Sequence, residues 1–103
     1  MLPPRDNEGY LVDLNDWSES VAAALAADEG IELGDEHWAL IRLIRDFYRD
    51  YQVSPAMRVL VKQVRERLGA ERGNSIYLMQ LFPGSPAKRL ARIAGLPRPT
   101  NCL

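Results

Sequence analysis

Residues 36–69, EHWALIRLIRDFYRDYQVSPAMRVLVKQVRERLG, hold two amphipathic segments joined by a short connection. The first carries apolar side chains three or four positions apart, at Trp38, Ile41, Ile44, Tyr48 and Tyr51. This spacing predicts a helix over 36–51, with Asp35 as its N-cap. Ser54-Pro55 then supplies an N-cap and a first-turn proline, which predicts a helix over 55–68 that ends before Gly69. The stretch therefore indicates a mostly helical protein.

The same kinds of signal recur on both sides of this stretch. Asp16, followed three positions later by Glu19, resembles a capping box and predicts a helix over 16–28. After 69, Asn74 or Ser75 opens a shorter helix that ends at Pro83-Gly84. Ser85-Pro86 repeats the cap-plus-proline pattern and predicts a last helix that Gly95 terminates. About five helices are expected.

The N-terminal residues before the first helix have a different pattern. Asn7-Glu8-Gly9 is a turn signal, and the β-capable run Tyr10-Leu11-Val12 follows it. A turn followed by such a run predicts a short β-hairpin at the N-terminus.

Length and composition restrict the class of protein. A chain of 103 residues with 47% hydrophobic and 26% charged residues is expected to form one globular domain, 1–103. The longest apolar run, 21–27, is far shorter than the roughly 20 residues of a transmembrane helix, and the first residues lack the apolar core of a secretory signal. We therefore expect a cytoplasmic protein. With one cysteine and one histidine, the sequence predicts neither an internal disulfide nor a metal site, and no cofactor is expected.

Charge is distributed unevenly along the chain. Residues 1–71 hold all 14 acids and 8 Lys or Arg, a net charge of −6, whereas residues 72–103 hold five basic residues and no acid. The basic part could dock an acidic protein surface or an RNA backbone, or could simply complement the acidic body.

Cys102 lies in this basic part, on the tail GLPRPTNCL (95–103). Pro97 and Pro99 restrict the tail to extended geometry, so we expect a C-terminal arm rather than more helix. Nearby cations favour a thiolate, but the chain offers no fixed general base or oxyanion donors around it. Such a cysteine suits a carrier of sulfur as a persulfide better than a stand-alone enzyme.

Other conspicuous residues have ordinary structural interpretations. Trp17 and Trp38 lie on apolar helix faces and are expected in the core, and His37 is expected to be an exposed helix-start residue. Asp46 and Asp50 lie one helical turn apart among arginines, at Arg42, Arg45 and Arg49, which is typical of a solvated, ion-paired helix face.

Four segments closely resemble the TusE/DsrC family of small sulfur-carrier proteins: GYLVDLNDW (9–17), EGIELGDEHW (29–38), RDFYRDYQVSPAMRVLVKQV (45–64) and GNSIYLMQLFPGSPAKRLARIAGLPRPTNC (73–102). The resemblance covers nearly the whole chain, and its most specific part is the AGLP-x-P-x-x-C ending. It implies a small orthogonal helical bundle with a short N-terminal hairpin and a mobile C-terminal arm, 95–103. DsrC proper has a second cysteine eleven residues before the penultimate one. Here that position is Ala91, so the tail resembles the TusE branch.

This resemblance implies that Cys102 accepts a persulfide sulfur from a TusBCD-type complex and passes it to an MnmA-type tRNA 2-thiouridylase. Arg98 and Arg92 are candidates for supporting the thiolate or docking the arm, and Gly95 is the expected hinge. An alternative is a single-cysteine regulatory protein that binds proteins or DNA through the helix-turn-helix-like pair 36–68. Direct DNA binding is disfavoured because the body is net acidic and the turn lacks the usual glycine.

Overall fold

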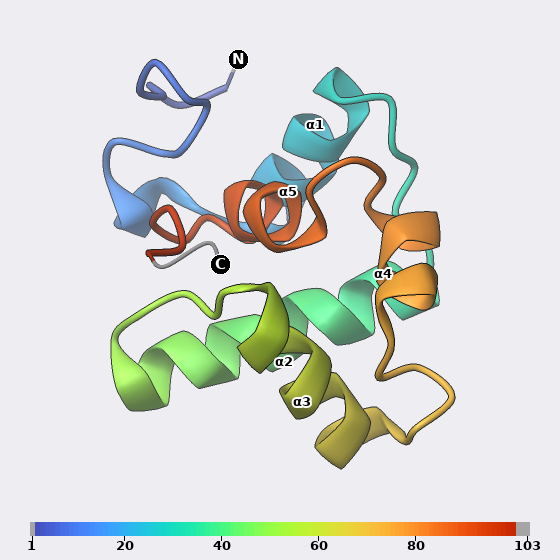
Figure 1. The fold of residues 1–103 in the computed structure, drawn as a ribbon. Helices are drawn as coiled ribbons and strands as arrows, with labels where there is room; N and C mark the ends of the chain where they lie inside the picture. Colours follow the sequence, from blue (N-terminus) through green and yellow to red (C-terminus); the bar gives the residue numbers. More distant parts are fainter. Residues whose placement is uncertain (1, 101–103) are drawn as a thin grey trace.

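The computed structural model describes residues 2–100, and the regular elements named in that range are all helices (Figure 1). A single 3₁₀ turn, η1 (Leu14–Asp16), precedes α1 (Glu19–Asp28). The remaining helices are α2 (Asp35–Tyr51), α3 (Met57–Leu68), α4 (Ser75–Leu81) and α5 (Pro86–Ile93). The prediction of about five helices is therefore confirmed.

Helix α5 occupies the centre of the bundle and packs against α1, α2, α3 and α4 (Figure 1). Its pattern of buried residues explains this position, because Leu90, Ala91 and Ile93 are each at most 1% exposed. Small and branched side chains let four helices approach one central element closely. The core includes Leu25 of α1 and Ile41 of α2, so residues far apart in sequence meet around the C-terminal helix.

The predicted N-terminal hairpin is wrong. Within residues 2–100 the only β-type contact is one antiparallel bridge between Arg5 and Leu11. Pro3 and Pro4 have no amide N–H to extend a ladder, and Tyr10 and Leu11 are both buried, so the segment lacks the alternation of a strand. Asp6 instead organises a turn, with its carboxylate accepting bonds from the amides of Glu8 and Tyr10.

Helix starts differ from the sequence predictions at three places. Helix α1 begins at Glu19, because the Ser18 side chain, rather than Asp16, caps it by accepting a bond from the Val21 amide. Helix α2 begins after Gly34. Helix α3 begins after Ala56, so Ser54 does not cap it. Several residues close together in the sequence could each cap the same helix, so the residue at which a helix begins is hard to predict.

His37 is half-buried rather than exposed. Its Nδ1 accepts a hydrogen bond from the Gly34 amide at 3.1 Å, and its Nε2 lies 3.1 Å from the carbonyl oxygen of Leu81. The ring also meets Phe82 edge-on, with ring centroids 5.2 Å apart. The imidazole therefore connects the start of α2 to the end of α4.

Candidate functional site

Cys102 itself lies outside the described residues, and the segment that leads to it leaves the end of helix α5. Helix α5 ends in a Schellman motif at Gly95, whose φ of +71° is the left-handed region that favours glycine. The Leu96 amide donates to the carbonyl of Ala91 at 2.9 Å, and the Gly95 amide donates to that of Arg92 at 3.2 Å. The predicted turn at Gly95 is thus present in its expected helix-end position.

Beyond Gly95 the described part of the predicted arm packs on the body instead of extending away from it. Leu96 is 3% exposed and Pro99 is fully buried. The hydroxyl of the buried Ser54 donates a hydrogen bond to the carbonyl oxygen of Pro97 at 2.6 Å. We call residues 95–100 the arm root.

Two side chains from other elements hold the end of α5, just before the arm root. The indole Nε1 of Trp17 donates to the carbonyl of Ile93 at 2.9 Å, and the guanidinium of Arg45 donates to that of Ala94 at 2.6 Å. The Arg45 guanidinium also lies over the Trp17 ring, 3.8 Å from its centroid. A cation at the C-terminus of a helix complements the helix dipole, and a cation stacked on an indole gains further attraction.

Arg45 therefore does not belong to the solvated ion-paired face that the sequence suggested. Partial burial lowers the pKa of its guanidinium. Asp46 does pair as expected, with Arg49 at 3.2 Å and with Arg67 at 3.4 Å. Arg42 lies over the Trp38 ring and forms no ion pair with a described residue.

Arg92 is placed toward the body rather than along the arm. It shares Glu29 with Arg89, at 3.1 and 2.8 Å respectively, and its guanidinium lies near the ring of Tyr10. The hydrogen bond to Glu29 raises the pKa of Arg92. These contacts give Arg92 a structural role in joining α5 to the end of α1.

Arg98 is on the arm root and forms an exposed ion pair with Glu8 at 3.2 Å. The structure thus brings Gly95 and Arg98 together on the arm root, with Arg92 one turn back on α5. Sequence analysis missed Arg45, Ser54, Trp17 and Glu8 as contacts of this segment. A signal existed for Arg45, since it lies four positions after the buried Ile41 and therefore on the core-facing side of α2.

Residues 2–100 contain no group of three or more His, Cys, Asp or Glu side chains placed to hold a metal ion. None of the helices in that range is both long and apolar enough to cross a membrane.

Taken together, these features define a small all-α protein whose C-terminal segment is anchored as far as Pro99 and leads to Cys102. The sequence matches the family described as DsrC like protein over residues 3–103. This chain therefore belongs to the DsrC-like family.

Curated relatives and solved structures agree with this assignment. The chain is 52% identical over 98 residues to "Sulfurtransferase TusE" of Salmonella paratyphi A, an alignment that covers 95% of this chain and 90% of the relative. It is 50% identical, with the same coverage, to the protein of that name in Escherichia coli K12. The NMR structure of Allochromatium vinosum DsrC matches with a TM-score of 0.87 and 52% identity, covering 96% of this chain and 88% of that one. The oxidized DsrC γ-subunit of dissimilatory sulfite reductase from Archaeoglobus fulgidus matches with a TM-score of 0.85 and 43% identity, covering 98% and 92%.

Proposed function

We propose that this protein is a cytoplasmic sulfur-relay carrier whose Cys102 holds sulfur as a persulfide. The observation that carries the proposal is the 52% identity, over 95% of the chain, to relatives named sulfurtransferase TusE. Cys102 is the one thiol in the sequence, so any cysteine-borne persulfide must form there.

Overall identity does not separate the two branches of the family, because a TusE relative and a DsrC structure are both 52% identical to this chain. The resemblance noted in the sequence gives Ala91 the position of the second DsrC cysteine. Ala91 lies in α5, is 1% exposed and carries no thiol, so an intramolecular disulfide with Cys102 is impossible. This favours the TusE-type role over that of a sulfite reductase partner.

The proposed donor is a TusBCD-type complex and the proposed acceptor is an MnmA-type thiouridylase bound to tRNA. The Cys102 thiolate attacks the outer sulfur of a donor persulfide, the donor's S–S bond breaks, and the donor cysteine leaves as a thiolate. One persulfide is lost and one is formed, so no external oxidant or reductant is needed. The terminal sulfur of Cys102 then passes to the thiouridylase for 2-thiouridine synthesis at the wobble position.

Intact mass spectrometry tests this proposal. The protein is incubated with a cysteine desulfurase, cysteine and the TusBCD-type complex, in parallel with Cys102→Ser. A mass gain of one sulfur atom in the wild type that is absent in Cys102→Ser supports the carrier role. Absence of that gain, while the donor complex is itself loaded, contradicts it and favours the regulatory alternative.

A further inference from the structure

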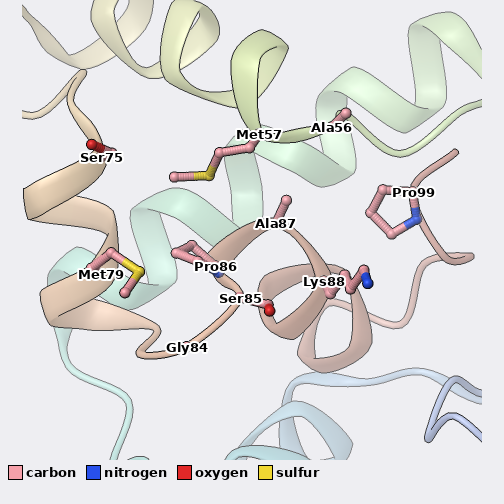
Figure 2. A pocket seen from close by; sticks show the side chains of 10 residues that line it. All are labelled: Ala56, Met57, Ser75, Met79, Gly84, Ser85, Pro86, Ala87, Lys88 and Pro99. Carbon is pink, nitrogen blue, oxygen red and sulfur yellow. The ribbon is translucent and has the colours of Figure 1, made fainter. Parts of the chain in front are cut away.

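Two cavities border the end of the arm root, one at Pro99 and one at Thr100. The first, of about 340 Å³, is formed by α3, α4 and the start of α5, and Pro99 lines one end of it. Figure 2 shows Met57 from α3 above Pro86 and Met79 from α4 to the left of it, with Pro99 on the right of the view. The second, of about 450 Å³, lies between α2, the 52–56 connection and the start of α3, and Thr100 lines it. Ala56 lines both cavities, so they adjoin at this residue, and we call their combined lining the arm-flanking surface.

The arm-flanking surface is mainly apolar, and the charged residues that line it are both positive. Its apolar lining includes large side chains that are partly exposed: Met79 (43%), Val53 (49%) and Val59 (39%). Arg58 and Lys88 are its only charged residues, and within the described part of the chain neither has a carboxylate partner. The sequence has more acids than bases, so this is a local basic, apolar surface whose two cations have no carboxylate partner among residues 2–100.

The arm-flanking surface lies close in sequence to the proposed sulfur-carrying residue, Cys102. Cys102 is two residues beyond Thr100, and two extended residues span at most about 7 Å. Any protein that reacts with Cys102 while the arm root is packed must therefore approach close to Thr100. Exposed apolar groups with a polar rim are typical of protein contacts, whereas a nucleic acid backbone is held by many cations and does not fill apolar cavities.

We propose that the arm-flanking surface is the docking site for a protein that exchanges sulfur with Cys102. The partner surface carries apolar side chains that enter the cavities, with Asp or Glu beside them facing Arg58 and Lys88. This inference rests on the proposed function for the identity of the partner. Its contacts are separate from the reacting thiol, so docking and transfer are measured separately.

Binding is measured by calorimetry to the TusBCD-type complex and to the MnmA-type thiouridylase, in a Cys102→Ser background that cannot transfer sulfur. Arg58→Glu is compared with Arg42→Glu, which reverses an exposed cation outside the surface that likewise has no carboxylate partner within residues 2–100. Met79→Ser is compared with Ile76→Ser, which removes a more exposed apolar side chain of the same helix, 72% exposed, that does not line the cavity. We expect Arg58→Glu and Met79→Ser each to weaken binding to at least one partner by about tenfold or more, and both controls to stay within about twofold.

The outcomes separate this inference from the proposed function. If wild-type Cys102 is loaded but Arg58→Glu and Met79→Ser bind both partners as tightly as their controls, the docking inference is overturned and the carrier role stands. If the binding losses appear but Cys102 is never loaded, the docking surface stands and the carrier role is overturned. Binding of tRNA alone that is lost in Arg58→Glu, with protein binding unchanged, overturns docking in favour of RNA contact.

Discussion

The indole Nε1 of Trp17 donates a hydrogen bond to the carbonyl oxygen of Ile93 at 2.9 Å, across 76 positions of sequence. This bond satisfies a carbonyl in the last turn of α5, where the helix itself supplies no partner. The N-terminal segment thereby fixes the direction in which the chain leaves α5. Since Gly95 packs directly against the same indole, the arm root depends on Trp17 both for hydrogen bonding and for shape.

Replacing Gly95 with alanine should destabilise the protein strongly. A Cβ at Gly95 would overlap the Trp17 side chain, and the backbone has a positive φ, so we expect a loss of about 2–4 kcal/mol. Gly84→Ala is the matched control, because Gly84 also has a positive φ of +89° but no atom lies within 4 Å of its Cβ position. Urea denaturation should show a loss of about 1 kcal/mol for the control. Equal losses would mean that packing on Trp17 contributes nothing.

Trp17 and Arg45 should be energetically coupled. We expect a double-mutant cycle of Trp17→Phe and Arg45→Lys to give a coupling free energy of about 0.5–2 kcal/mol, since the guanidinium lies 3.8 Å from the ring centroid. Lysine keeps the charge but loses the flat stacking surface of arginine. Additive effects in denaturant unfolding would show that the stacked geometry is not stabilising.

Removing the Ser54 hydroxyl should loosen the arm root at modest cost. Ser54→Ala leaves the Pro97 carbonyl without its donor, and we expect a loss of about 1 kcal/mol of stability together with faster amide hydrogen exchange at Leu96. Ser85→Ala is the control, since the Ser85 side chain makes no capping bond to α5, and it should change stability by less than about 0.5 kcal/mol. Unchanged exchange at Leu96 in Ser54→Ala would contradict an anchoring role.

The helices could be predicted from sequence because apolar periodicity and cap residues are local signals. Helix α2, for example, starts and ends within one residue of its predicted bounds of 36–51. The contacts of Arg45 and Ser54 could not be predicted, because their acceptors lie 49 and 43 positions away. The neighbouring sequence predicted an ion-paired helix face for Arg45 and an N-cap for Ser54. In the structure both side chains instead donate hydrogen bonds to distant backbone carbonyls.

The hairpin prediction was wrong for a different reason. The turn at Asp6–Gly9 does form, with the Gly9 amide donating to the Asp6 carbonyl at 3.0 Å. The segment before the turn, however, cannot form a full strand, because Pro3 and Pro4 have no amide N–H to donate to a partner strand. For Cys102, the reactive thiol is known from the sequence, and the described structure shows how the arm root that precedes it is held on the body.

Stability should fall with rising pH as Tyr77 ionises. The Tyr77 hydroxyl donates to Glu36 at 2.6 Å, and burial together with this carboxylate raises its pKa from 10.0 to about 12. Because the folded pKa is above the unfolded value, this stabilising effect is fully present below pH 10 and is lost between pH 10 and about 12. Absorbance titration of phenolate should show a group ionising near pH 12 that is missing in Tyr77→Phe. A titration of Tyr77 near pH 10 would contradict the assignment.

Arg98 should matter for transfer and not for folding. Its ion pair with Glu8 is exposed on both sides, so Arg98→Ala should change the free energy of unfolding by less than about 0.5 kcal/mol. If its guanidinium supports the anionic form of Cys102 or docks the arm, the same variant should lower the rate of persulfide loading severalfold. Glu8→Ala is the informative control, because it breaks the same ion pair but keeps the cation on the arm root. Loading that falls in Arg98→Ala and is retained in Glu8→Ala assigns the effect to the guanidinium itself, whereas an unchanged loading rate and thiol pKa in Arg98→Ala would remove Arg98 from the site.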